Sequence, residues 1–228
     1  AADSGTRAIL LYIESIQDRR AFMSAARAAA RNKPVIAIKA GRSPNNPLMG
    51  VSDPLFLEMP NLVSHDDVHD AALRRAGILR VDQLEEMFGA AETVLRARPL
   101  RGNRLVVLSN GGGAGLMVED SLYLAGYSLP SLKEQTIERL RRFMSPGWNG
   151  RNPLEIRVDS EPACYERLLK ILQEERDGDA VLLIHTPNAL SSSIDTAQQV
   201  IATARETGIN LMTCWVGDES VEKERNLF

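Results

Sequence analysis

The sequence of 228 residues predicts an α/β fold with parallel sheets. Short apolar runs, rich in Leu and β-branched residues and flanked by polar or turn residues, are typical of strands that are buried on both faces. Between them lie stretches in which apolar residues recur with a period of 3.6, as in amphipathic helices. Because buried strands alternate with helices, we expect parallel strands joined by crossover helices on both sheet faces.

The elements follow in order along the chain. In the first half, strands are predicted at 8–13 and 35–38, and helices at 20–30, 68–76 and 83–97. In the second half, strands are predicted at 105–108, 181–184 and 209–213, and helices at 116–125, 132–144, 165–174 and 196–207. Side chains that can cap a first helical turn precede four of the helices, and glycines follow three of them: Asp18, Asp82, Ser131, Ser160, Gly77, Gly126 and Gly208.

A basic segment with Pro and Gly, residues 98–103, separates a long helix from a new strand. We therefore predict two domains, 1–98 and 99–228. Residues 43–67 show neither period and carry four prolines, which predicts a long loop; its part 44–64 is expected to be poorly ordered or displaced from the glycine turn described below.

Composition excludes several classes of function. The net charge is −3, with 27 basic and 30 acidic residues interspersed, so no polybasic face for nucleic acid is expected. No apolar run approaches the roughly 20 residues of a membrane span, and a cytoplasmic location is expected. Cys164 and Cys214 lie in unrelated segments and are interpreted as buried thiols, without a disulfide.

The sharpest local pattern is the segment Asn110, Gly111, Gly112 and Gly113, between a predicted strand and helix. Such a turn directs backbone N–H groups and the positive end of a helix toward one point, which favours a phosphate or carboxylate. A tight turn packed on the sheet is the alternative. The segment lacks the Gly-x-Gly-x-x-Gly spacing of dinucleotide sites and the Lys of a P-loop.

Three further residues are candidates for lining that site. His185 and Thr186 follow the strand at 181–184, at the end of a parallel strand where α/β proteins bind ligands, and Asn152 lies in a turn that enters a strand. A structural His185 and a plain chain reversal at Asn152 are the alternatives. His65 and His69 have the spacing of metal ligands, but no third ligand is evident, so no metal is predicted.

Several separated strings resemble the NDP-forming acyl-CoA synthetases, relatives of succinyl-CoA synthetase. These strings are 9–14, 31–43 and 70–81 for the first flavodoxin-like domain of that family, and 109–112, 152–153 and 186–187 for the second. The resemblance implies two flavodoxin-like three-layer domains. It also implies a mobile histidine, within a Ser-His-Thr-Gly tetrad, that carries a phosphoryl group between an acyl-phosphate site and a nucleotide site.

The sequence departs from the family at this tetrad. Alignment without gaps puts Glu58 or Asp53 at the histidine position, and only Ser64 and His65 keep the Ser-His pair. Asp66 and its neighbour then follow His65, and their charge would repel a phosphorylated imidazole.

The sequence resembles bacterial protein lysine acetyltransferases in which a synthetase-like region is fused to a GNAT domain. Two features carry this resemblance: the tetrad is missing, as in those proteins, and several strings are similar, among them 31–34, 41–44, 98–102 and 215–220. The main interpretation is therefore a non-catalytic, regulatory region of such an enzyme. It implies acetyl-CoA or CoA and ATP as ligands of the parent protein, flanking CoA-binding, ATP-grasp-like and GNAT domains, and a protein lysine substrate. The alternatives are an active acyl-CoA synthetase fragment with His65 as carrier, and a stand-alone flavodoxin-like binding module; homo-oligomerisation is left open.

Overall fold

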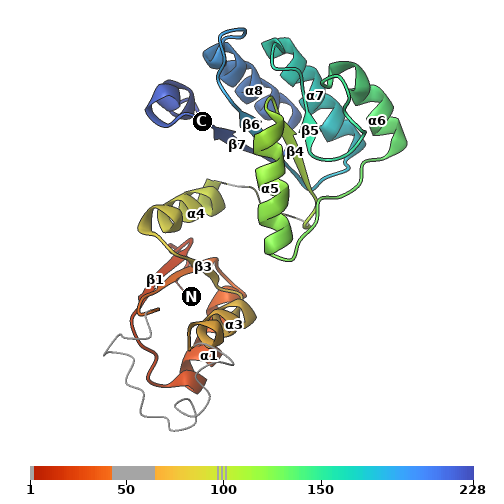
Figure 1. Cartoon of the computed structure of the whole chain (residues 1–228). Helices are drawn as coiled ribbons and strands as arrows, with labels where there is room; N and C mark the ends of the chain where they lie inside the picture. Colours follow the sequence, from red (N-terminus) through yellow and green to blue (C-terminus); the bar gives the residue numbers. More distant parts are fainter. Residues whose placement is uncertain (1–2, 43–64, 97, 99, 101) are drawn as a thin grey trace. The chain divides into compact units, whose positions relative to one another are not determined.

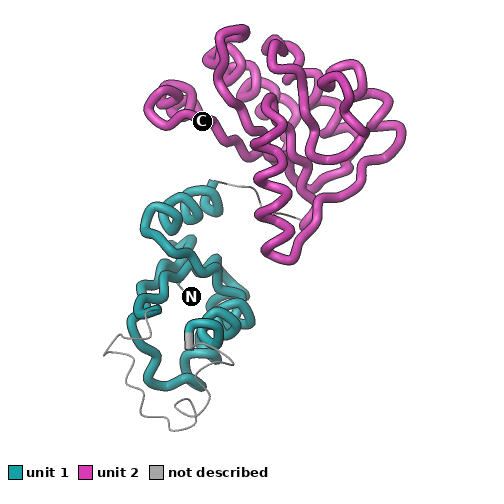
Figure 2. Tube along the Cα trace, in the orientation of Figure 1, with its two compact units in different colours: residues 1–96 teal, residues 97–228 magenta. Residues whose placement is uncertain are grey.

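A computed structural model describes residues 3–42, 65–96, 98, 100 and 102–228. The chain divides into two compact units, Ala1–Arg96 and Ala97–Phe228 (Figure 2). Among the described residues, unit 1 has a parallel sheet of three strands and unit 2 a parallel sheet of four, so the predicted α/β class is confirmed. The division predicted after residue 98 lies close to this boundary. The loop predicted at 44–64, with Asp53, Glu58 and Ser64, lies outside the described residues.

Unit 1 has a sheet in the order β1-β2-β3 with helices on both faces (Figure 1). Its elements are β1 (Ile9–Ile13), α1 (Arg19–Ala30), β2 (Val35–Lys39), α3 (His65–Ala76), β3 (Leu79–Val81) and α4 (Leu84–Arg96). Helices α1 and α3 enclose a core around Val35, Ala37 and Leu73, while α4 covers Ile36 and Ile38 on the opposite face. The side chains of β2 alternate between these two cores, which is why residues 35–38 are all apolar.

Unit 2 has a sheet in the order β5-β4-β6-β7. Its elements are β4 (Leu105–Ser109), α5 (Gly112–Leu124), α6 (Glu134–Leu140), η1 (Arg141–Phe143), β5 (Leu154–Glu155), α7 (Pro162–Glu175), β6 (Ala180–His185), α8 (Ser193–Thr207), β7 (Leu211–Trp215), η2 (Asp218–Val221) and α9 (Glu222–Arg225). The main core lies between α7, α8 and the strand residues Val106, Leu108 and Leu183. Helix α5 packs on the other face of β4 (Figure 1).

The strand order of unit 2 has a topological switch point between β4 and β6. Strands β4 and β6 are neighbours in the sheet. The chain after β4 leads to β5 on one side of this pair, and the chain after β6 leads to β7 on the other side, so the loops that follow β4 and β6 run in opposite directions. Open α/β sheets bind ligands at the carboxyl ends of strands at such a switch point. The loop residues concerned are Asn110 after β4 and Thr186 after β6.

The structure confirms one of the predicted helix caps and contradicts two others. Asp18 caps α1 as predicted, because its Oδ1 accepts a hydrogen bond of 2.9 Å from the Ala21 amide. Ser131 and Ser160 do not cap their helices: the residues at the caps of α6 and α7 are Lys133 and Glu161, without side-chain bonds.

Candidate functional site

The glycine turn of unit 2 connects β4 to α5 and leaves the start of the helix uncapped by any side chain. Ser109 fixes the turn, since its Oγ accepts from the Gly111 amide at 3.1 Å and donates to the Gly111 carbonyl at 2.7 Å. Helix α5 begins at Gly112, so two of the predicted loop glycines belong to its first turn. First-turn amides have no intrahelical acceptor, and the positive end of the helix macrodipole lies here.

Asn110 joins the two loops at the switch point. Its Oδ1 accepts a 2.7 Å hydrogen bond from the Thr186 amide, and its Nδ2 donates to the Thr186 carbonyl at 2.9 Å. The side chain is 4% exposed. The predicted neighbours Asn110 and Thr186 are therefore brought together, but the amide group of Asn110 is used within the protein. What remains for a ligand is the amides of Gly112 and Gly113, since that of Gly111 is bonded to Ser109, and the Thr186 hydroxyl, which lies 3.5 Å from the point that a Cβ on Gly111 would occupy.

The carboxylate of Glu155 lies against the first turn of α5. A Cβ built on Gly112 would be 2.8 Å from Glu155 Oε2 and 2.9 Å from Oε1, so the exposed carboxylate would have to move away if residue 112 had a side chain. A negative charge at the amino end of a helix is favourable. The internal carboxylate is thus placed where an external anion would bind. This contact is not visible in the sequence, because Glu155 and Gly112 lie far apart along the chain.

Asn152 has a structural role at the same edge. Its Oδ1 accepts from the Val107 amide and its Nδ2 donates to the Leu105 carbonyl, both at 2.9 Å. The side chain therefore pairs with β4 as a further strand residue would, beyond the two-residue strand β5. The Asn152–Pro153 peptide is cis, and Pro153 lies close to Gly115 on α5, 3.0 Å from the position of a Cβ there.

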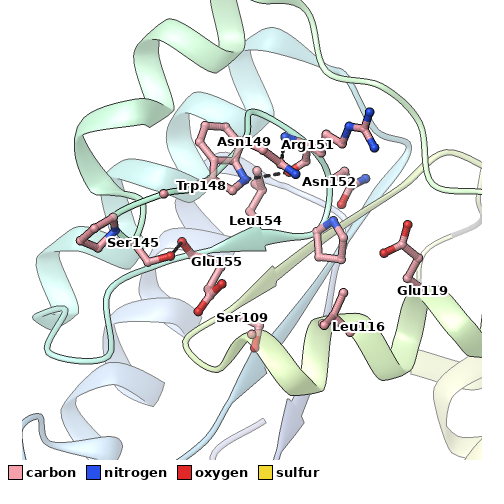
Figure 3. A pocket seen from close by; sticks show the side chains of 15 residues that line it. Ser109, Leu116, Glu119, Ser145, Trp148, Asn149, Arg151, Asn152, Leu154 and Glu155 are labelled. Atoms are coloured by element: carbon pink, nitrogen blue, oxygen red, sulfur yellow. Dashed lines mark hydrogen bonds between the residues drawn. The ribbon is translucent and has the colours of Figure 1, made fainter.

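A pocket of about 310 Å³ lies between the start of α5 and residues 145–155 (Figure 3). Trp148, Leu116 and Pro153 supply apolar surface, while Glu119 and Arg151 carry charge. The Trp148 indole donates to the Arg151 carbonyl at 2.8 Å, which fixes the ring in the wall. Asn152 lines this pocket, but its polar atoms are bonded to β4.

His185 lies in the core, and the structure does not place it as a lining residue. It is 0% exposed, its Nδ1 is 3.1 Å from the Tyr165 hydroxyl, and its ring centroid is 4.4 Å from that of Trp215. Its Nε2 is buried without a hydrogen-bond partner among the described residues. Burial lowers the pKa of the imidazole to about 4, so the ring is neutral at physiological pH.

In unit 1, charged side chains gather where α3 begins, beside the carboxyl end of the sheet. His65 is the first residue of α3, and Asp66 follows it. The carboxylate of Asp66 forms ion pairs with Arg80 of β3 and, at 3.5 Å, with Arg42. One of the two carboxylates that were expected to repel a phosphorylated imidazole is therefore paired with guanidinium groups.

Two further observations concern the described part of the chain alone. No cluster of three or more His, Cys, Asp or Glu side chains there is arranged to hold a metal, and no helix there combines the length and apolarity needed to cross a membrane. Both cysteines are free; Cys164 is half-buried, whereas Cys214 is exposed, so the expectation of a buried thiol is wrong at Cys214.

Comparison with known proteins places these units in context. The family described as the succinyl-CoA ligase-like flavodoxin domain matches residues 1–94. Among curated relatives, acetate–CoA ligase [ADP-forming] I of Archaeoglobus fulgidus is 32% identical over 227 residues, which is 100% of this chain and 31% of the relative. The alpha subunit of acetate–CoA ligase [ADP-forming] II of Pyrococcus furiosus is 32% identical over 78% of this chain and 38% of its own length.

A solved structure has the same fold. The dinucleotide-forming acetyl-coenzyme A synthetase 1 of Candidatus Korarchaeum cryptofilum, in complex with phosphate and ADP, superposes with a TM-score of 0.81 at 25% identity, covering 99% of this chain and 48% of that one. The chain thus spans about a third of the length of the curated relatives named above. All three are ligases or synthetases, and none is an acetyltransferase.

Proposed function

We propose that this chain is a segment of an ADP-forming acyl-CoA ligase of the NDP-forming acyl-CoA synthetase family, which it resembles along its whole length. In this proposal the segment takes part in phosphoryl transfer between an acyl phosphate and a nucleotide. The single observation that carries it is homology to ADP-forming acetate–CoA ligases over the whole chain. A relative that binds phosphate and ADP agrees with ATP, ADP and CoA as ligands of the full-length protein.

The two units would contribute different groups. Unit 2 offers the backbone amides of Gly112 and Gly113 and the Thr186 hydroxyl to an anionic group, with Glu155 as the carboxylate that such an anion has to displace. Flanking CoA-binding and ATP-grasp-like domains would supply the sites for CoA and nucleotide. The acyl group itself is left open by this segment.

Unit 1 would contribute the phosphoryl carrier. His65 keeps the only Ser-His pair in the sequence, and the carboxylate that follows it is paired with Arg42 and Arg80. In the step that we propose, an imidazole nitrogen attacks the γ-phosphorus of ATP. The new N–P bond forms as the bond from phosphorus to the bridging oxygen breaks, ADP leaves, and the imidazole gives its proton to solvent.

A second candidate is the regulatory region of a GNAT-fused protein lysine acetyltransferase. The observation that favours it is the absence of a Ser-His-Thr-Gly tetrad anywhere in the sequence. In this case the segment binds acetyl-CoA or a related ligand together with its flanking domains, and the acetyl group goes to a lysine of another protein.

Labelling of the full-length protein separates the two candidates. Incubation with ATP labelled at the γ-phosphate is expected to give an acid-labile, base-stable phosphoenzyme in the wild type. His65→Asn should abolish the label, whereas His69→Asn, one helical turn further along α3, should retain it. Absence of label in the wild type, together with acetylation of a protein lysine, would contradict the ligase proposal and support the second candidate.

A further inference from the structure

We infer that the carboxyl ends of β6 and β7 enclose a binding site for one water molecule, which accepts hydrogen bonds from His185 Nε2–H and Trp215 Nε1–H. The inference does not depend on the proposed ligase function. It concerns the interior of unit 2 and polar groups that the candidate anion site does not use.

Buried polar atoms without a hydrogen-bond partner are concentrated at this end of the sheet. Six such side-chain atoms occur in the described part of the chain, and three of them are His185 Nε2, Trp215 Nε1 and Ser193 Oγ. His185 ends β6 and Trp215 ends β7, and the two residues are paired in the sheet. Ser193 is the first residue of α8. Since buried polar groups in native proteins are nearly always bonded to protein or to ordered water, three together need a common partner.

The proton of the His185 imidazole lies on Nε2. Its Nδ1 is 3.1 Å from the Tyr165 hydroxyl, which keeps its own proton because burial raises the pKa of this hydroxyl. If Tyr165 donates to Nδ1, the ring has one unpaired group within the described residues, Nε2–H. If Nδ1 donates instead, both the hydroxyl proton and Nε2 are unpaired. The first arrangement leaves fewer polar groups unsatisfied and is therefore the favoured tautomer.

The surroundings of the two N–H groups are largely apolar. The ring centroids of His185 and Trp215 are 4.4 Å apart, and the Trp215 ring also contacts Phe228 at 5.8 Å. Trp215 packs with Ala197 and Val221 in a small apolar cluster. None of these three neighbours has a polar side-chain atom. Because both N–H groups are buried and lack an acceptor within the described residues, the acceptor has to be small, and water fits.

A water molecule can use all four of its hydrogen bonds here. Its oxygen accepts from both N–H groups. Ser193 lies four residues before Ala197, on the face of α8 that packs toward Trp215, so we assign one proton of the water to Ser193 Oγ. Burial lowers the pKa of His185, and the charge of Glu224 acts in the opposite direction. Glu224 is 8% exposed, and we assign the other proton of the water to its carboxylate.

This water would connect β6, β7, α8 and α9 behind the candidate anion site. The His185 carbonyl accepts a 2.9 Å hydrogen bond from the Val216 amide, and the next residue, Thr186, is held by Asn110. The bonds of the water thus anchor the end of β6 from the side of the core. Its role is to position Thr186 rather than to react.

Crystallography of the full-length protein, at a resolution that shows ordered water, is the first test. One density peak should lie within about 3.2 Å of both His185 Nε2 and Trp215 Nε1, and within the same distance of Ser193 Oγ. The inference is wrong if no peak is found, or if the peak reaches only one of the two nitrogens. A Glu224 carboxylate that accepts directly from either N–H group would also overturn it.

NMR of the full-length protein labelled with ¹⁵N at Trp and His tests the same water in solution. The Trp215 indole N–H should show a nuclear Overhauser effect to water with the sign of a long-lived internal molecule, and the proton of His185 should be found on Nε2. The Trp148 indole is the matched control, since it donates to the Arg151 carbonyl at 2.8 Å and should show no such effect. A His185 proton on Nδ1, or no effect at Trp215, would contradict the inference.

Trp215→Phe removes one donor and keeps an aromatic ring. In crystals of this variant the density peak should be lost or displaced, whereas Trp148→Phe should leave the peak unchanged. Circular dichroism shows whether each variant is folded, and the two measurements on the wild type decide the question without them. A peak that is unaltered in folded Trp215→Phe would show that the indole does not hold the water.

Discussion

His185 makes unit 2 sensitive to acid, and the size of the effect can be calculated from its burial. The imidazole has a pKa of about 4 in the folded protein against an ordinary value of 6.5. Below pH 6.5 the imidazole of His185 is protonated in the unfolded chain, whereas in the folded unit it stays neutral until the pH falls to about 4. The free energy of unfolding therefore decreases through this window, by about 3 kcal/mol in total and about 2.5 kcal/mol by pH 4.5.

Denaturant unfolding at pH 7.0, 5.5 and 4.5 tests this magnitude. Both tryptophans, Trp148 and Trp215, lie in unit 2, so their fluorescence follows the unfolding of that unit. In His185→Phe the titrating group is absent, and the loss of stability on acidification should be smaller by about 2.5 kcal/mol at pH 4.5. The variant is less stable overall, because the Tyr165 hydroxyl loses its partner. Equal pH dependence in wild type and variant would refute the reasoning.

Two further predictions concern the turn at α5. Gly112→Ala should leave the free energy of unfolding nearly unchanged, because the helix propensity that alanine adds, up to about 1 kcal/mol, is offset when the exposed Glu155 carboxylate has to move away from the helix amino end, which costs about 0.3–1 kcal/mol. In a Glu155→Ala background the same substitution should stabilise by up to about 1 kcal/mol; equal effects in both backgrounds, measured by chemical denaturation, would contradict the contact. Asn152→Leu should cost about 2–4 kcal/mol, because the Val107 amide and the Leu105 carbonyl lose their partner. Asn152→Asp should keep the bond from the Val107 amide, and hydrogen exchange at that amide distinguishes the two variants.

The parts of the fold that were predicted correctly depend on local patterns. The apolar runs that became β1, β2, β4 and β6 are strands buried by helices, and their periodicity is visible within a few residues. Strand β3 was not predicted, since it has three residues, with Leu79 exposed and Arg80 in its middle. Helix α5 starts four residues earlier than position 116, because its first glycines have low helix propensity and show no apolar period.

Only those parts of the candidate site that consist of neighbouring residues in the sequence could be predicted. The glycine turn is visible as a string, but the contacts that decide its role join residues far apart in sequence. Asn110 meets Thr186, Asn152 meets β4, and the Glu155 carboxylate reaches Gly112. Likewise, the position of His185 at the end of a strand agrees with a ligand site, yet only packing against Tyr165 and Trp215 reveals a core residue.

The most direct test of the central claim is synthesis of ATP by the full-length protein from acetyl-CoA, ADP and inorganic phosphate, with release of CoA and acetate. The account predicts that ATP forms, and that His65→Asn abolishes its formation while His69→Asn does not. No ATP with acetyl-CoA or other acyl-CoA substrates, in a protein that transfers acetyl groups to a protein lysine, would contradict the account.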